Sequence, residues 1–452
     1  MSDTTASSQP KMLSSNMKYY TLAILTIVYA FNFIDRQILV ILQPLIKTDL
    51  DLSDTQLGLL SGIAFAAFYT FMGIPIARLA DKKNRRNIIA ISLTIWSGMT
   101  AVSGLAQNYL QLLLARLGVG IGEAGGSPPA HSMISDMFTP KKRATALAIY
   151  SAGLYLGVVI GYSFGGVLGV TYGWRTTFMI VGLPGLLLAL ILWLTVKEPP
   201  RGQYDKVGAE APPSFANTLR YVLKLKAFPY LAVGSALSAF VSYGVSNFMP
   251  SFLFRYHLSD LAAMGSSLGF SGNSDYEIAY SMIGITLGLV GGGAGIIGTF
   301  LGGYLTDKIG QNDARWYMWL PGLTAVLAIP FAIYAFHTSS VELVLILIFI
   351  VNVLGTLYLP PAIAVTHRLV TPRMRALSSA ILFFILNLIG LGLGPLFIGM
   401  LSDFLTKING YESLHWAMTI GACIALIKGI LFFIAGKNLK KDLERVEGGK
   451  QH

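Results

Sequence analysis

Residues 126–149 read GSPPAHSMISDMFTPKKRATALAI, and residues 358–381 read YLPPAIAVTHRLVTPRMRALSSAI. The two stretches align without a gap at an offset of 232 residues. A Pro-Pro-Ala triplet, a Thr-Pro pair and an Arg-Ala pair fall at the same places in both. This match between distant parts of one chain indicates that a single structural unit occurs twice.

A second pair of stretches repeats in the same order. ARLADKKNRR at 77–86 corresponds to GYLTDKIGQN at 303–312, which places Asp81 over Asp307 at an offset of 226 residues. The small difference between the two offsets fits into a loop. We therefore predict two halves of one architecture that rock about a site at the membrane midplane.

The composition assigns the chain to the membrane. Hydrophobic residues make up 54% and charged residues 12% of the 452 residues, and the mean hydropathy is +0.62. A soluble domain carries about 25% charged residues, whereas the apolar runs here recur at about the 20 residues that cross a bilayer as a helix. We predict an all-α, multi-pass protein of the cytoplasmic (inner) cell membrane. The single cysteine, Cys423, excludes an internal disulfide, and the sequence contains no motif for a metal or another cofactor.

The apolar runs predict twelve spans, and the basic residues predict their orientation. Segments on the side of the two termini hold 26 Lys and Arg, against 4 on the other side. This bias predicts cytoplasmic termini and assigns the net charge of +11 to loops that face anionic lipid rather than to nucleic-acid binding. The spans are expected near 19–46, 53–77, 87–106, 111–135, 144–168, 176–196, 228–254, 278–304, 315–336, 341–366, 377–404 and 413–436. The expected parts are a cytoplasmic tail at 1–18, a six-helix bundle at 19–196, a cytoplasmic linker at 197–227, a second bundle at 228–436 and a tail at 437–452.

Several of these motifs resemble one transporter family. The loop at 77–86 resembles the signature G-x-L-a-D-r-x-G-r-r of the major facilitator superfamily, with Ala77 and Asn84 in place of two glycines, and RLGVGIGE at 116–123 resembles its R-x-x-x-G-x-G element. FIDRQI at 33–38, together with the GEA and TPxxRAxA elements, resembles the Spinster branch. The resemblance implies a monomeric carrier without a cofactor. Spinster-like proteins include exporters of sphingosine-1-phosphate and carriers of lysophospholipids, so it also implies a lysolipid-like or sphingoid-phosphate-like substrate.

Four ionisable residues lie well inside the predicted first-half spans: Asp35, Arg36, Arg116 and Glu123. A charge at mid-depth costs at least about 2.5–3.5 kcal/mol on insertion scales, so such groups normally face a wet cavity and pair with one another. The repeat-related positions in the second half carry no charge. The plain alternative is that these residues only neutralise each other and hold two spans together.

We expect Asp35 and Glu123 to exchange protons, because two acids near one base leave a surplus negative charge that a retained proton relieves. Arg36 would bind the anionic head of a substrate, since its planar guanidinium matches phosphate and carboxylate. Proton and substrate would then compete for one charge balance, which predicts antiport. Arg116 is expected near the inner half-depth, where it tunes Glu123 or binds the cytoplasmic end of the proton relay. The alternative is that it only packs between helices or snorkels.

Further polar and aromatic residues in the spans are candidates to contact the substrate. In the first half they are Asn32, Phe33 and Tyr69, and in the second half Tyr243, Asn247, Asn352, Tyr358 and Asn387. Aromatic residues at such spacings also occur as ordinary packing. The roles of His131 and His367 stay open.

Cytoplasmic loop charges predict a latch between the halves. A carboxylate in such a turn can face the N-terminus of a neighbouring helix, which stabilises by about 0.3–1 kcal/mol, and such a latch must break when the site opens inward. The alternative is a solvated loop charge. The candidate latch residues are Asp81, Arg85, Arg86, Arg143, Asp307 and Arg375.

Other function classes fit the sequence less well. A channel needs a repeated ring of polar positions, whereas the charges here lie in one half. An enzyme needs a nucleophile that faces a base, and the adjacent His131 and Ser132 point apart on a helix. A carrier or exporter of small anions, sugars or drugs and a non-transporting lipid sensor remain as alternatives.

Overall fold

The computed structural model describes residues 13–202, 204 and 214–448, and in these residues it contains helices and no strand. The first half consists of α1 (Ser15–Leu50), α2 (Asp54–Ser61), α3 (Ile63–Lys82), α4 (Arg85–Ser103), α5 (Tyr109–Glu123), α6 (Ser127–Met137) and α7 (Pro140–Thr195). A short helix, α8 (Phe215–Lys224), precedes the second half. That half consists of α9 (Phe228–Tyr256), α10 (Leu258–Ser267), α11 (Asp275–Gly310), α12 (Trp316–His337), α13 (Val341–Thr356), α14 (Leu359–Arg368), η1 (Pro372–Met374), α15 (Arg375–Ile385), the π-helical η2 (Leu386–Leu393), α16 (Gly394–Asn409), α17 (Leu414–Cys423) and α18 (Ala425–Gly448).

The prediction of twelve spans in an all-α fold is confirmed. Nine helical stretches in the described part of the chain are long and apolar enough to cross a membrane. The longest, α7, contains two rods that meet at Gly173, whose φ of 78° breaks the helix and favours glycine. The remaining two rods are α4 and the pair α5 and α6, which a three-residue turn separates.

Polar caps start several helices next to the loops. Ser53 and Gln56 form a capping box that starts α2, and the Asn108 and Ser274 side chains accept backbone hydrogen bonds that start α5 and α11. Such caps satisfy N–H groups that no helical partner reaches. The hydrophobic runs that follow then continue as uninterrupted spans.

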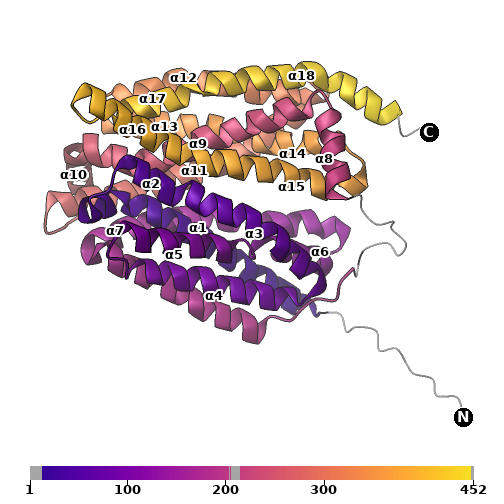
Figure 1. Cartoon of the computed structure of the whole chain (residues 1–452), viewed down its shortest axis with the longest axis horizontal. Coiled ribbons are helices and arrows are strands. Elements are labelled where there is room, and N and C mark those ends of the chain that lie inside the picture. The colour runs from indigo at the N-terminus through magenta and orange to yellow at the C-terminus, as the bar shows by residue number, and fades with distance from the viewer. Residues whose placement is uncertain (1–12, 203, 205–213, 449–452) are drawn as a thin grey trace, which may run out of the picture.

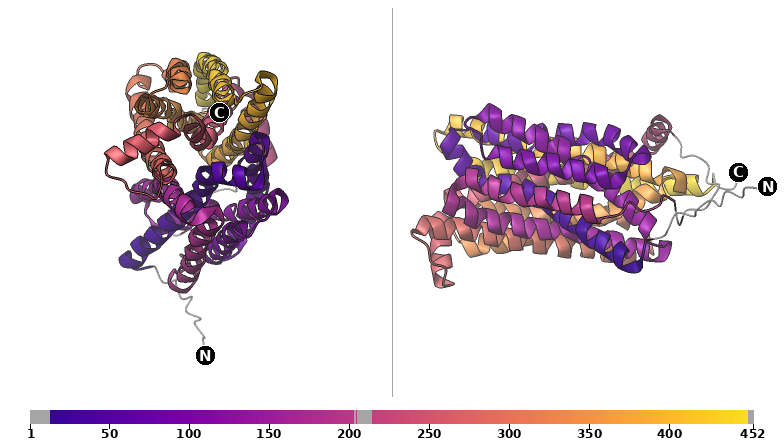
Figure 2. Two further views of the ribbon diagram at one scale, coloured as in Figure 1. Left: turned by 90° about the vertical axis from the view of Figure 1, so that its left-hand side faces the viewer. Right: turned by 90° about the horizontal axis from the view of Figure 1, so that it is seen from below.

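The two halves lie side by side along their length (Figure 1). The start of α1 and the end of α18 lie at the same end of the molecule (Figure 2). We call this the terminal end, and we call the opposite end, which carries α10 and the 50–54 and 409–414 connections, the distal end.

The hydrophobic cores show that the halves are joined at the distal end. One cluster there combines both halves, for example Ile41 and Leu57 with Phe248 and Phe252. Towards the terminal end the core divides into one cluster around Trp96, composed largely of first-half residues, and another composed largely of second-half residues together with residues of α8. Buried apolar area is the main favourable term in packing, so the distal end is the closed end of the molecule.

Glycines spaced four residues apart in 153–165 and 284–292 allow close helix packing. Those in 153–165 lie against α1. Those in 284–292 lie against α7 across the boundary between the halves, and a Cβ on Gly284 would lie 2.5 Å from the Tyr162 carbonyl oxygen. A hydrogen bond of 2.5 Å between the Tyr155 and Thr299 hydroxyls continues this seam.

Candidate functional site

Arg36 and Glu123 form a buried ion pair between α1 and α5. The Arg36 Nε donates to Glu123 Oε2 at 2.7 Å. The Glu123 side chain is fully buried and that of Arg36 is 13% exposed. The helices bring these two residues together as the sequence predicts, because both lie near the middle of their spans.

Three aromatic rings surround the Arg36 guanidinium. Its carbon lies 5.1 Å from the centroid of Phe33, 4.8 Å from that of Phe65 and 4.9 Å from that of Tyr69. The faces of such rings attract cations by about 0.5–2 kcal/mol each. Arg36 is therefore held as a cation by the rings as well as by Glu123.

Asp35 is completely buried beside this pair. Neither of its carboxylate oxygens accepts a hydrogen bond of ordinary length from the described residues, and the Thr100 side chain is a neighbouring donor. Its electrostatic neighbours include Glu123 and Arg116. An ionised carboxylate in such surroundings is costly, so the group depends on its neighbours or on a proton.

Arg116 completes a cluster of two acids and two bases, which corrects two expectations. It is 2% exposed and lies on the distal side of Glu123, because α5 runs from the distal end towards the terminal end. It therefore does not snorkel, and it balances the negative charge that we expected to be in surplus. Its Nε and Nη1 have no hydrogen-bond partner in the described part of the chain.

Two adjacent cavities lie between the halves. The smaller, of about 60 Å³, is lined by Arg36, Arg116 and Asn247 among others. The larger, of about 290 Å³, has mainly apolar walls from α1, α7, α9, α11, α12, α13, α17 and α18. Both cavities are lined by Phe33, Gln37, Tyr162, Tyr243 and Ser246.

The predicted substrate-contacting residues divide into those at the cavities and those elsewhere. Asn352 and Tyr358 line the larger cavity. Asn247 is occupied, because its Oδ1 accepts hydrogen bonds from Gln43 and Ser61 across the boundary between the halves. The others are Tyr243 and Phe33 at both cavities, Tyr69 against Arg36, the buried Asn32 one helical turn before Arg36, and Asn387 in η2 outside both cavities.

Two of the predicted latch residues, Arg85 and Arg86, contact their own half in this conformation. Arg85 is 1% exposed and binds Asp136, Glu198 at 2.7 Å and Ser132 at 2.8 Å, so it ties α4 and α6 to the end of α7. The Arg86 backbone N–H also donates to Glu198.

The two repeated aspartates are exposed near the C-terminal ends of α3 and α11, and not in the connecting turns as expected. The Asp81 carboxylate has no partner among the described residues. Asp307 accepts a hydrogen bond of 3.1 Å from the Tyr317 hydroxyl in its own half. Arg143 and Arg375 lie in the first turns of α7 and α15. A latch between the halves at these residues stays a prediction for another conformation.

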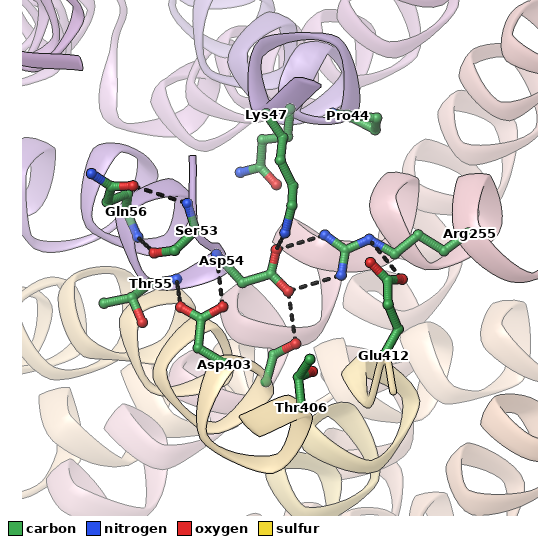
Figure 3. A network of polar contacts seen from close by, with 12 residues as sticks. Pro44, Lys47, Ser53, Asp54, Thr55, Gln56, Arg255, Asp403, Thr406 and Glu412 are labelled. Carbon is green, nitrogen blue, oxygen red and sulfur yellow. Dashed lines mark hydrogen bonds and ion pairs between the residues drawn. The ribbon is translucent and has the colours of Figure 1, made fainter. Parts of the chain in front are cut away.

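A polar network at the distal end was missed by the sequence analysis (Figure 3). Asp54 is 2% exposed and binds Lys47 at 2.6 Å, the two Arg255 terminal nitrogens at 2.6 and 2.8 Å, and the Ser402 hydroxyl at 2.7 Å. The Asp403 carboxylate accepts the Asp54 and Thr55 backbone N–H groups at the start of α2. We call Lys47, Asp54, Arg255, Ser402, Asp403 and Glu412 the distal network.

The distal network connects the halves, and the sequence contained a signal for it. Lys47 and Asp54 belong to the first half, and the other members belong to the second. Only four basic residues fall on this side of the predicted spans, and two of them, Lys47 and Arg255, are in the network. The scarcity of bases on this side was the signal that these two could have specific partners.

Comparisons with known proteins point to one family. The model of the Major Facilitator Superfamily matches residues 25–274 and 272–451. The chain is 32% identical over 424 residues to an MFS-type efflux pump from Mycolicibacterium smegmatis, covering 93% of each protein. It is 24% identical over 451 residues to protein spinster homolog 3 from Danio rerio, covering 97% of this chain and 89% of the relative.

A solved structure has the same fold. It is the crystal structure of a bacterial homolog to the human lysosomal transporter Spinster in an inward-facing and unoccupied conformation. The TM-score is 0.82 at 36% sequence identity, and the match covers 95% of this chain and 99% of that one.

Proposed function

Because the chain belongs to the Major Facilitator Superfamily, in its Spinster branch, we propose that it is a proton-coupled carrier of an anionic or zwitterionic amphiphile that works by alternating access. The protein is a multi-pass membrane transporter, not an enzyme. The positive-inside bias supports a cytoplasmic terminal end and an inner-membrane location. The observation that carries the proposal is the buried Arg36–Glu123 pair beside the completely buried Asp35.

The coupling step is the exchange of partners at Arg36. In this conformation the Glu123 carboxylate is paired with the Arg36 guanidinium. A proton on Glu123 removes the charge that holds Arg36, which is then free to bind the phosphate or carboxylate of a substrate. An anion that takes Arg36 leaves a buried carboxylate that holds a proton more firmly, so anion binding is accompanied by proton uptake. Proton uptake on anion binding favours transport of the proton and the anion in the same direction, whereas the sequence led us to expect antiport.

Asp35, beside Arg36 in α1, and Arg116, on the distal side of Glu123 in α5, both act on this exchange. Asp35 accepts no hydrogen bond of ordinary length from the described residues, and the Thr100 side chain is a neighbouring donor that gives its negative charge limited support. A proton is the least costly way to bury such a group, so we assign Asp35 a proton in this conformation. Arg116 then balances whichever of the two acids is ionised.

The cavities suit an amphiphile. Arg36 and its aromatic rings border the smaller cavity, and the larger one continues from it with mainly apolar walls. An anionic head at Arg36 and an aliphatic chain in the larger cavity would satisfy both regions.

Alternating access follows from the two ends of the molecule. The distal network and the shared core hold the distal end closed, and the cores are separate at the terminal end. We infer an inward-facing conformation, in agreement with the inward-facing relative. Opening to the other side requires the distal network to break and the α7–α11 seam to rearrange.

Transport of 1-oleoyl lysophosphatidylglycerol into reconstituted vesicles tests the proposal. We expect a pH gradient to drive accumulation of the lysolipid by the wild type. The variants Asp35→Asn and Glu123→Gln should lose this gradient-driven accumulation. Glu444→Gln, at an exposed acid on α18, is the matched control and should behave as the wild type. Unchanged gradient-driven transport in both site variants would contradict proton coupling at these residues.

A second candidate is the export of drugs or small organic anions. The mainly apolar larger cavity and the similarity to an efflux pump favour it. Competition separates the two: lysolipids should displace a bound reporter if the substrate is an amphiphile, and only sugars, carboxylates or drugs should do so otherwise.

A further inference from the structure

Lys428 is a buried cation in the second half that the site described above does not use. It lies in α18, is 5% exposed and lines the larger cavity. Among the described residues it is the one charged side chain in that lining. Its ammonium group has no hydrogen-bond or ion-pair partner among them.

Such a group needs compensation. Removing an ammonium ion from water costs several kcal/mol unless a partner replaces the water. The acids of the second half do not provide one, because Asp307, Asp403 and Asp442 lie towards the ends of their helices. The walls near the cavity offer aliphatic groups, hydroxyls and amides. An anion in the cavity would supply the partner that keeps the Lys428 side chain charged.

We propose that Lys428 is an anion-binding subsite of the larger cavity. It binds the carboxylate or phosphate of an elongated, mainly apolar ligand in the conformation in which Glu123 occupies Arg36. The inference rests on the proposed function for the view that this ligand is the transported amphiphile. It adds a contact in the second half, where the sequence predicted only neutral polar groups.

The position of Lys428 relative to Arg36 supports a shared role. Each residue lies about 14 residues, or about 21 Å of helix, from the distal end of its span. They therefore lie at similar depth in opposite halves. The two cavities that they line share residues from α1 and α9, including Gln37 and Ser246. An anion held by Lys428 lies next to the cavity of Arg36 and can reach it when Glu123 takes a proton.

The aliphatic part of the ligand has a place in the same cavity. Val158, Leu287, Val290 and Ile329 contribute to walls that come from both halves. The volume of about 290 Å³ is at the lower end of small-molecule sites. It suits one chain rather than the two chains of a bilayer phospholipid.

Binding measurements on full-length protein in detergent test the subsite, with probes kept below their critical micelle concentrations. The probes are 1-oleoyl lysophosphatidylglycerol for phosphate, oleate for carboxylate and 1-oleoylglycerol as the neutral match. We expect Lys428→Met to weaken binding of at least one anion by about tenfold and binding of 1-oleoylglycerol by less than twofold. The anion that loses affinity identifies the headgroup chemistry.

Two variants control for charge and for folding. Lys428→Arg keeps the charge and should retain most of the anion affinity, and Lys437→Met makes the same change at an exposed position of α18 and should bind as the wild type. Ligand-free Lys428→Met should be at least as heat-stable as the wild type, because an uncompensated buried charge is removed.

The outcome is separable from the proposed function. Unchanged affinity of Lys428→Met for both anions, or an equal loss for the neutral probe, overturns the subsite and leaves proton coupling at Glu123 untouched. Proton coupling is tested separately by the vesicle assay, and the result of that assay does not depend on the affinity of Lys428→Met.

Discussion

Arg255 of α9 binds Asp54 at the start of α2 through both terminal guanidinium nitrogens, at 2.6 and 2.8 Å. The Asp54 side chain is 3% exposed and that of Arg255 is 10% exposed, so water hardly screens this pair. The pair connects the two halves where their hydrophobic cores also merge. It is therefore positioned to hold the carrier closed at its distal end.

Breaking this pair should open the distal end. Asp54→Asn removes the charge that Arg255 and Lys47 share, and the loss of one partner of a buried pair costs about 3–5 kcal/mol. We expect the distance between spin labels at the exposed Leu105 and Tyr411, one in each half, to gain a longer component. The labels require a Cys423→Ser background, because Cys423 is exposed.

The control for this change is Asp49→Asn. Asp49 pairs with Arg175 at 2.6 Å, but both belong to the first half and their side chains are about 40% exposed. Exposed pairs contribute about 0–1 kcal/mol, so the label distance should not change. An equal response of the two variants would mean that the distal network does not hold the halves together.

Arg85 should act on the stability of the first half. Arg85→Gln leaves Asp136 and Glu198 without their shared cation, and we expect the free energy of unfolding to fall by about 3 kcal/mol. Asp81→Asn, at an exposed carboxylate, should change it by less than about 0.5 kcal/mol. Thermal unfolding measures both.

The same pair of variants tests the predicted latch. If Asp81 binds the other half in an outward-facing state, Asp81→Asn alters the transport rate without altering stability. A normal rate in Asp81→Asn would remove this residue from the latch.

The seam between α7 and α11 should not accept a side chain at Gly284. A Cβ there would lie 2.5 Å from the Tyr162 carbonyl oxygen and 2.9 Å from the Gly166 Cα. Overpacking of this kind costs about 1–3 kcal/mol, so Gly284→Ala should lower the melting temperature. Gly73→Ala is the control, since no atom lies within 4 Å of a Cβ at Gly73. Equal melting temperatures of Gly284→Ala and Gly73→Ala would show that the seam can accommodate a methyl group at residue 284.

Arg36→Lys should not preserve function. Lysine keeps the charge but loses the planar contact with Phe65 and Tyr69 and the geometry of the bond to Glu123. We expect the affinity for 1-oleoyl lysophosphatidylglycerol to fall about tenfold, whereas Arg445→Lys on the exposed side of α18 should leave it unchanged. Wild-type affinity in Arg36→Lys would show that the rings do not orient the cation.

The sequence predicted the fold and the first-half charge cluster well, for identifiable physical reasons. The repeat and the length of the apolar runs depend on local chemistry, and a buried ionisable pair such as Arg36 and Glu123 stands out in an apolar helix. Charged residues are rare inside membrane spans, so they can be recognised from the sequence alone.

The parts that were missed depend on contacts between distant segments. Nothing near Asp54 along the chain indicates that Arg255 and Ser402 surround it. Lys428 lies within a predicted span, but the role proposed for it depends on a cavity that other helices build. The depth of Arg116 was misjudged, because the direction of α5 decides which end of the helix faces the cytoplasm.

The central claim, that protonation of Glu123 frees Arg36 for an anion, is tested most directly by counting protons on binding. Calorimetric titration of 1-oleoyl lysophosphatidylglycerol at pH 7, in buffers with different ionisation enthalpies, gives the number of protons exchanged, and the phosphodiester of this probe does not titrate near that pH. The account predicts net proton uptake by the wild type and none by Glu123→Gln. The same proton number in both proteins, or proton release by the wild type, would contradict it.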